Sequence, residues 1–246
     1  TTQLQVSRKP SRPQSIARHS LLARFWPAAT DLPSKQDVVL TTADGVRLHA
    51  EDHAAEVDYG KIPLLCLPGL TRDSRDFAPA LPHLRQQRRV ILMDLRGRGR
   101  SSHADDPASY RPDVEANDVL ALLSHIKIPK VAIIGTSRGG IVGMLLAATE
   151  RTHVAGLLLN DVGPVLEKHG LLRIKGYLGK QPAFASFEAA ANALKQDQQG
   201  MLGLSDAEWL AFARRIFRDD NGIPRLSYDP KLAVTFPSEE QIEAAT

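Results

Sequence analysis

Ser137 stands in a short glycine-rich stretch whose spacing could make it a nucleophile. The stretch Gly135-Thr136-Ser137-Arg138-Gly139 follows an apolar run and precedes a helical pattern. The spacing G-x-S-x-G is typical of a tight strand-to-helix turn that pushes the serine Oγ outward. Its glycines fit positions where a Cβ would collide with the neighbouring strand or helix. The alternative role for Ser137 is an ordinary helix N-cap.

Two nucleotide-binding motifs also use clustered glycines, and neither fits this stretch. A Walker loop needs a lysine and then a serine or threonine after its second glycine, where this chain has Ile141 and Val142. A Rossmann fingerprint needs a glycine where Arg138 stands. We predict neither a cofactor nor a metal ion.

The segments around Ser137 alternate between strand patterns and helix patterns. Alternating residues on either side of Ala43-Asp44-Gly45 predict a hairpin. Short, nearly continuous apolar runs, typical of strands buried on both faces of a parallel sheet, follow at 62–67, 89–94, 130–135 and 154–160. The predicted fold class is therefore α/β, with a doubly wound, mostly parallel sheet. Ligands bind such sheets beyond the carboxyl ends of the strands, where Ser137 lies.

Three motifs in chain order carry a resemblance to a known family. They are Leu67-Pro68-Gly69-Leu70, DLRGRGRSS at 94–102 and the stretch around Ser137. With these motifs, residues 36–163 resemble the α/β-hydrolase fold. The resemblance implies a serine hydrolase that forms an acyl-enzyme on Ser137. It also implies that the backbone N–H groups of Leu70 and Arg138 form the oxyanion hole.

A catalytic serine also needs a base and an acid, and here the sequence is less informative. The resemblance implies the order serine, acid, histidine, with the histidine after the last strand. Only His153 and His169 follow Ser137, and neither stands at that position. Asp161 directly follows the run 154–160, and the resemblance makes it the candidate acid, because some family members place the acid there. Its alternative role is that of a turn or capping residue.

Asp94 is a second acidic residue at the end of an apolar run. It has the same two possible roles as Asp161. We predict that it braces its own loop through an ion pair with one of three following residues, Arg96, Arg98 or Arg100.

The chain divides into four predicted parts. Residues 1–35 form a basic extension, 36–163 the hydrolase core, 164–237 a helical cap with many aromatic residues, and 238–246 the start of a further helix. Strands 7 and 8, which the resemblance implies, are not found. We therefore expect a C-terminally incomplete core. For the 246 residues taken alone, we expect little or no turnover, because they contain no well-placed base for Ser137.

Composition limits the partners and the compartment. The net charge is +3, and residues 1–30 alone carry five basic side chains and no acid, so the body lacks the excess of basic residues that nucleic acid requires. Apolar runs are too short to span a bilayer, and the one cysteine, Cys66, forms no intramolecular disulfide. We expect a soluble cytoplasmic protein, or a mitochondrial one because of the basic N-terminus. The oligomeric state stays open.

The resemblance therefore implies a hydrolase of small esters or lactones that have an apolar part. Enol-lactonase-like and carboxylesterase-like activities fit equally well. The alternative is a non-catalytic protein of the same fold that binds a ligand or a partner through the pocket.

Overall fold

The computed structural model describes residues 34–197 and 203–244. The predicted basic extension over residues 1–35 lies outside this range, except for positions 34 and 35.

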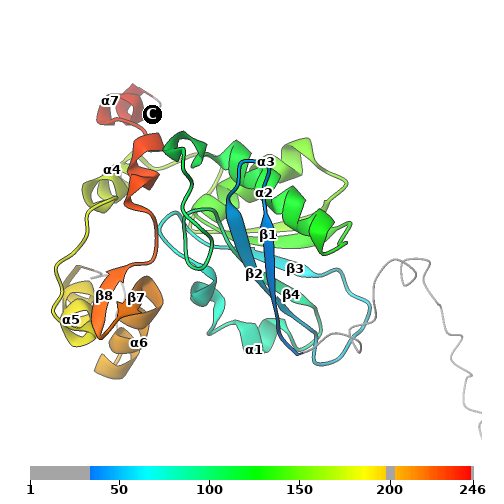
Figure 1. The fold of residues 1–246 in the computed structure, drawn as a ribbon, viewed down its shortest axis with the longest axis horizontal. Coiled ribbons are helices and arrows are strands. Elements are labelled where there is room, and N and C mark those ends of the chain that lie inside the picture. The colour runs from blue at the N-terminus through cyan, green and yellow to red at the C-terminus, as the bar shows by residue number, and fades with distance from the viewer. Residues whose placement is uncertain (1–33, 198–202, 245–246) are drawn as a thin grey trace, which may run out of the picture.

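A mostly parallel sheet forms the centre of the described molecule, in the strand order β1-β2-β4-β3-β5-β6 (Figure 1). The strands are β1 (Gln36–Thr41), β2 (Arg47–His53), β3 (Leu64–Leu67), β4 (Val90–Asp94), β5 (Val131–Thr136) and β6 (Val154–Asn160). β2 pairs antiparallel with both β1 and β4, whereas β4, β3, β5 and β6 run parallel to one another. The predicted fold class is confirmed.

Helices cover both faces of this sheet (Figure 1). On one face Leu65 and Leu67 pack in the main core with α2 (Pro112–His125) and α3 (Arg138–Thr149). Between them in sequence, Cys66 faces the other way and packs near α1 (Leu81–Leu84) and the 3-10 helix Ser74–Phe77. This opposite orientation follows from the two-residue period of a strand. Burial raises the pKa of the Cys66 thiol to about 12.

The segment after residue 163 lies beside the sheet and has a small core of its own (Figure 1). Its helices are α4 (Lys168–Tyr177), α5 (Phe187–Asp197), α6 (Asp206–Ile216) and α7 (Glu239–Ala244). A capping box starts α6, in which Ser205 and Glu208 exchange both capping hydrogen bonds. Trp209 of α6 and Phe187 of α5 belong to the buried cluster that joins the two helices.

An antiparallel hairpin departs from our expectation that residues 164–237 would contain only helices. Its strands are β7 (Phe217–Asp220) and β8 (Ile223–Leu226). Asn221 and Gly222 connect them, both with positive φ, at 53° and 85°. An Asn-Gly pair of this kind favours the two-residue turn whose twist matches that of the strands. The turn residues therefore form a hairpin directly after α6, and the helical pattern that precedes them does form that helix.

The chain after β8 returns to the sheet and is hydrogen-bonded to the loop that follows β4. The N–H of Gly99 donates to the carbonyl of Ser227 at 2.8 Å, and the N–H of Asp229 donates to the carbonyl of Gly97 at 2.7 Å. The Tyr110 hydroxyl donates to the Asp229 carboxylate at 2.6 Å. These bonds hold the segment after residue 163 against the end of the sheet where Ser137 lies.

His49 on β2 is buried between two carboxylates at the edge of the core. Its Nδ1 lies 3.0 Å from Asp94 Oδ2, and its Nε2 lies 3.1 Å from Asp37 Oδ1. Burial lowers the pKa of the His49 imidazole, but the hydrogen bonds to Asp94 and Asp37 outweigh that effect. The pKa of His49 is therefore raised above its ordinary value of 6.5.

This raised pKa predicts that His49 stabilises the protein most at low pH. The contribution of protonated His49 is fully present below about pH 6.5 and is lost as the pH rises through the folded-state pKa. We expect His49→Gln to lower the free energy of unfolding more at about pH 5.5 than at about pH 9. Urea denaturation at both pH values measures this, with His169→Gln on the exposed side of α4 as the control. An equal cost at the two pH values would contradict the prediction.

Candidate active site

Ser137 occupies a sharp turn between β5 and α3. Its backbone has φ 47° and ψ −111°, a conformation that non-glycine residues rarely adopt. Two backbone hydrogen bonds hold it there: the N–H of Ser137 donates to the Asn160 carbonyl at 2.9 Å, and the N–H of Ile141 donates to the Ser137 carbonyl at 3.0 Å. Such a conformation costs roughly 1–3 kcal/mol and persists only where its surroundings enforce it.

The glycines on either side of Ser137 allow the turn to pack closely against its neighbours. A Cβ on Gly135 would lie 2.6 Å from the Cα of Gly140. A Cβ on Gly139 would lie 2.1 Å from the carbonyl oxygen of Leu67 on β3. Both distances are far below van der Waals contact, so neither position accepts a side chain without movement of the backbone.

The Ser137 side chain does not act as the ordinary N-cap that we considered as an alternative. Ser137 stands at the N-cap position of α3, but its side chain makes no capping hydrogen bond. A capping serine normally has an extended backbone, unlike the positive φ found here. The side chain instead contributes to the wall of a pocket.

That pocket has a volume of about 1180 Å³ and is lined by residues of both the sheet and the segment after residue 163. Gly69, Leu70, Ser137 and Asp161 line it from the ends of the parallel strands. Aromatic side chains that line it from the later segment are Tyr177, Phe184, Phe212, Phe217 and Tyr228. The pocket therefore combines polar groups at the strand ends with a largely apolar opposite wall.

The two candidate oxyanion residues lie on adjoining segments. The N–H of Gly139 donates to the carbonyl of Pro68 at 3.0 Å, which joins the start of α3 to the loop after β3. A Cβ on Gly69 would lie 3.8 Å from the Ser137 Cβ, so this loop runs beside the serine. Arg138 is the first residue of α3, where a backbone N–H has no partner within the helix and the helix dipole favours an anion.

Asp161 is both a turn residue and a residue of the pocket lining. It has a positive φ of 56°, as expected for a turn residue directly after β6. It also lines the same pocket as Ser137. Asp161 thus lines the pocket from the turn that follows β6.

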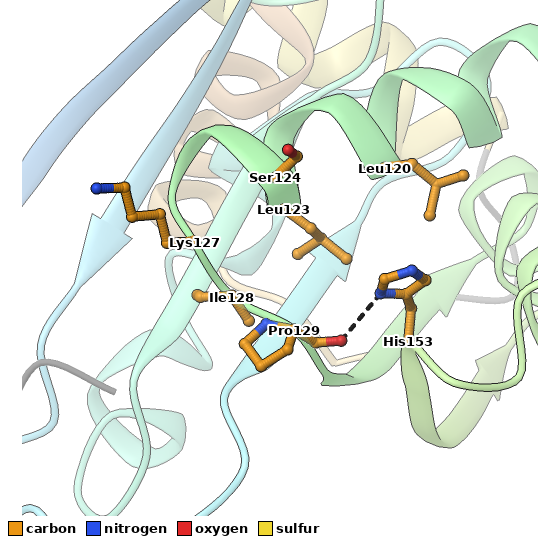
Figure 2. Close-up of a pocket in the computed structure, with 7 residues that line it drawn as sticks. All are labelled: Leu120, Leu123, Ser124, Lys127, Ile128, Pro129 and His153. Atoms are coloured by element: carbon orange, nitrogen blue, oxygen red, sulfur yellow. Dashed lines mark hydrogen bonds between the residues drawn. The ribbon is translucent and has the colours of Figure 1, made fainter. Parts of the chain in front are cut away.

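Neither histidine that follows Ser137 lines this pocket. His153 comes just before β6, at the end of the sheet opposite to Ser137, and its Nδ1 lies 2.9 Å from the Pro129 carbonyl oxygen. Figure 2 shows it at the rim of a second pocket of about 580 Å³ with Leu120, Leu123 and Ser124. His169 is exposed on α4. The described lining of the Ser137 pocket contains no histidine.

The predicted ion pair of Asp94 with a following arginine is wrong, although Asp94 does brace the loop. Asp94 is 1% exposed, and its carboxylate accepts hydrogen bonds from the backbone N–H groups of Ser74 at 2.7 Å and Arg100 at 3.0 Å. The three long arginine side chains extend past it to acids on other elements: Arg96 to Asp118, Arg98 to Glu115 and Arg100 to Asp37. Backbone donors are nearer to the buried carboxylate than any guanidinium.

Three arginines that the sequence did not single out also line the Ser137 pocket, namely Arg72, Arg173 and Arg215. The guanidinium groups of Arg72 and Arg215 lie 5.3 Å and 5.6 Å from the ring centre of Phe212. Asp76 pairs with Arg72. Nothing in the local sequence distinguishes these arginines from ordinary surface residues, because the packing of distant segments brings them to the pocket.

Metal-binding clusters and membrane-spanning helices are both missing from the part of the chain that the structure describes. No group of three or more His, Cys, Asp or Glu side chains there is arranged to hold a metal ion. No helix among those residues is long and apolar enough to cross a membrane.

Comparison with known families identifies the fold. A family model described as "alpha/beta hydrolase fold" matches residues 62–245, about three-quarters of the chain. The chain therefore belongs to the α/β hydrolase fold family. A crystal structure of an α/β hydrolase from Novosphingobium aromaticivorans is similar over 87% of this chain and 77% of its own, with a TM-score of 0.77 and 35% identity.

Among curated proteins, the chain is similar to 3-hydroxybutyrate-oligomer hydrolase of Cupriavidus necator. The two are 36% identical over 177 residues, which cover 70% of this chain and 60% of that protein. A shorter similarity, 47% identity over 58 residues, covers 24% of this chain and 21% of 3-oxoadipate enol-lactonase 2 of Acinetobacter baylyi. The chain thus spans about 60% of the length of the Cupriavidus hydrolase.

Proposed function

We propose that this protein is a serine hydrolase of small esters or lactones, with Ser137 as the nucleophile. The observation that carries the proposal is the strained turn at Ser137, whose side chain lines the large pocket and makes no capping bond. A protein gains nothing in stability from such a conformation, whereas a nucleophile needs exposure at the end of the sheet.

The reaction has two halves. Ser137 Oγ attacks the carbonyl carbon of the ester while a general base takes the Oγ proton, and the carbonyl oxygen becomes an oxyanion. The N–H groups of Leu70 and Arg138 donate to this oxyanion. Collapse of the intermediate breaks the ester bond, and the leaving alcohol takes the proton. Water then hydrolyses the acyl-enzyme by the same steps, and Asp161 is the candidate acid that orients the base.

The apolar pocket wall and the similarity to the Cupriavidus hydrolase support a substrate that has a short acyl chain with a polar end. Phe184 and Phe212 line the pocket opposite the strand ends. Oligomers of 3-hydroxybutyrate, the compounds in the name of the Cupriavidus protein, are joined by ester bonds and end in a carboxylate. Arg173 and Arg215 on the pocket wall are suited to such an end group.

Hydrolysis assays on the full-length protein test this function. We expect turnover of p-nitrophenyl esters with short acyl chains and of the 3-hydroxybutyrate dimer, and a decline for long chains. Binding of these compounds without turnover would instead favour the second candidate, a non-catalytic ligand-binding member of the fold. The favouring observation for that candidate is the absence of a histidine from the described pocket lining.

Phe212 offers a test of the apolar wall. Its ring lines the pocket near the guanidinium groups of Arg72 and Arg215 and packs edge-on against Trp209, with ring centres 5.9 Å apart. We expect Phe212→Ala to raise the KM for p-nitrophenyl butyrate about tenfold, because apolar contact area is lost. Phe212→Leu keeps most of that area and should raise the KM much less. A KM for Phe212→Ala within about twofold of the wild-type value would contradict the assignment.

A further inference from the structure

A buried carboxylate lies behind the two segments that carry the candidate oxyanion donors. Glu115 on α2 is fully buried, and its side chain contacts two guanidinium groups. Its Oε1 lies 2.7 Å from Arg98 Nη1, and its Oε2 accepts a hydrogen bond from Arg138 Nε at 2.6 Å. One acid therefore joins a residue of the loop after β4 to the first residue of α3.

Each of the two arginines is connected to one side of the candidate oxyanion hole. Arg98 Nε donates to the backbone carbonyl of Leu70 at 2.9 Å. Arg138 carries the other candidate N–H on its own backbone, and its Nη2 donates to the Tyr110 carbonyl at 2.7 Å. The contacts from the Leu70 carbonyl through Arg98 and Glu115 to Arg138 thus connect one donor residue to the other.

Burying these two charges costs free energy, because the side chains of Arg98 and Glu115 are both completely removed from solvent. Burial lowers the pKa of the Arg98 guanidinium, and the attraction of Glu115 offsets only part of that lowering. Without the carboxylate, the guanidinium groups of Arg98 and Arg138 would face each other with no negative charge between them. Removing one partner of such a pair is strongly destabilising, because it leaves a buried charge without compensation, and we expect the remaining charged side chains to shift in response.

We infer that Glu115 is a positioning residue for the oxyanion hole, which sets the spacing between the N–H groups of Leu70 and Arg138 through Arg98 and the Arg138 side chain. The inference rests on the proposed function, since the spacing of these donors matters only if Ser137 attacks a carbonyl. A displaced N–H group stabilises the oxyanion much less, because this stabilisation depends on preorganised geometry.

The same helix supplies a matched control. Asp118, one turn further along α2, is almost as buried as Glu115 and pairs with a buried arginine, Arg96. Arg96 Nε and Nη2 each donate to Asp118 at 2.6 Å, and Nη1 donates to Asp44 at 2.7 Å in the turn between β1 and β2. In the described part of the chain, the side chains of this second network contact neither Leu70 nor Arg138, and its one link to the first network is the backbone carbonyl of Arg96, which accepts a hydrogen bond from Arg98 Nη1 at 2.5 Å. Asp118→Asn therefore disrupts a comparable buried pair away from the oxyanion hole.

The experiment compares Glu115→Gln and Asp118→Asn in the full-length protein, with kcat and KM for p-nitrophenyl butyrate and the melting temperature measured for each. We expect both variants to melt at lower temperature. Only Glu115→Gln should lower kcat, by about 10- to 100-fold, with little change in KM. Equal kcat values for the two variants would overturn the inference and leave Glu115 with a structural role alone.

Two further outcomes are informative. If Glu115→Gln fails to fold, Arg138→Met is measured in its place. This variant removes the guanidinium of Arg138 and keeps the Arg98–Glu115 pair. It should lower kcat about 3- to 10-fold at unchanged KM, and an unchanged kcat would overturn the inference. If the wild-type protein hydrolyses no ester, the proposed function fails and the inference fails with it. If the wild-type protein hydrolyses esters and the Glu115→Gln and Asp118→Asn variants have equal kcat values, the inference is refuted and the proposed function stands.

Discussion

Replacing Ser137 with alanine should lower kcat for p-nitrophenyl butyrate by about 10⁴-fold or more, while the melting temperature changes little. The hydroxyl makes no capping hydrogen bond, so its removal costs α3 nothing at its N-terminus. The lost Oγ is the atom that attacks the ester carbonyl in the proposed mechanism. Steady-state kinetics and thermal unfolding of the same preparations measure both effects.

Ser124→Ala is the matched control for this experiment. Ser124 lies on α2 and lines the second pocket, at the opposite end of the sheet. This variant should retain wild-type kcat. If Ser137→Ala retained more than about a tenth of the wild-type activity, the nucleophile would have to be another residue.

Gly139→Ala should lower the free energy of unfolding by about 3 kcal/mol or more, the largest stability effect that we expect from one added methyl group. The new Cβ would lie 2.1 Å from the carbonyl oxygen and 2.5 Å from the carbonyl carbon of Leu67. Leu67 is paired with Gly135 in the register of β3 and β5, so it cannot move without breaking that pairing. Urea denaturation measures the cost.

The control for Gly139→Ala is another glycine within a helix. Gly170 lies in α4, and a Cβ there meets nothing within 4 Å. Gly170→Ala should therefore stabilise the protein by about 0.5–1 kcal/mol, the usual gain for alanine over glycine in a helix. A cost below about 1 kcal/mol for Gly139→Ala would contradict the close packing of the turn at Ser137.

The sheet and the position of Ser137 were predictable because local patterns determine them. Continuous apolar runs mark strands buried on both faces, and the observed β5 and β6 agree with the runs 130–135 and 154–160. The turn at Ser137 was predictable because the spacing of its two glycines is a local pattern, although the contact that requires Gly139 is with Leu67 on the neighbouring strand β3. The hairpin after α6 had a local signal as well, the pair Asn221-Gly222, but the helical pattern before it led us to expect helices alone.

Side-chain pairing between distant elements was not predictable in the same way. Asp94 was assigned to an arginine in its own loop because the sequence shows proximity along the chain only, whereas its actual donors are His49 and two backbone N–H groups. Glu115 had one signal that could have indicated its burial. It precedes Val119 by four residues on α2, so it lies in phase with the apolar face. An acid in that phase is buried and must find a cationic partner.

Local sequence patterns did not identify the general base for Ser137 either. His153, one of the two histidines that follow Ser137, lies at the opposite end of the sheet from it. The candidate acid, Asp161, stays a prediction, because a turn residue directly after β6 would occupy the same place at the pocket wall.

The central claim, that Ser137 is the nucleophile, is tested most directly by covalent labelling. The full-length protein is treated with a fluorophosphonate, digested, and analysed by mass spectrometry to locate the phosphonyl group. The account predicts one phosphonyl group per chain on the peptide that contains Ser137, loss of ester hydrolysis in proportion to labelling, and no labelling of Ser137→Ala. A phosphonyl group on another residue, or full hydrolysis by a protein that resists labelling, would contradict it.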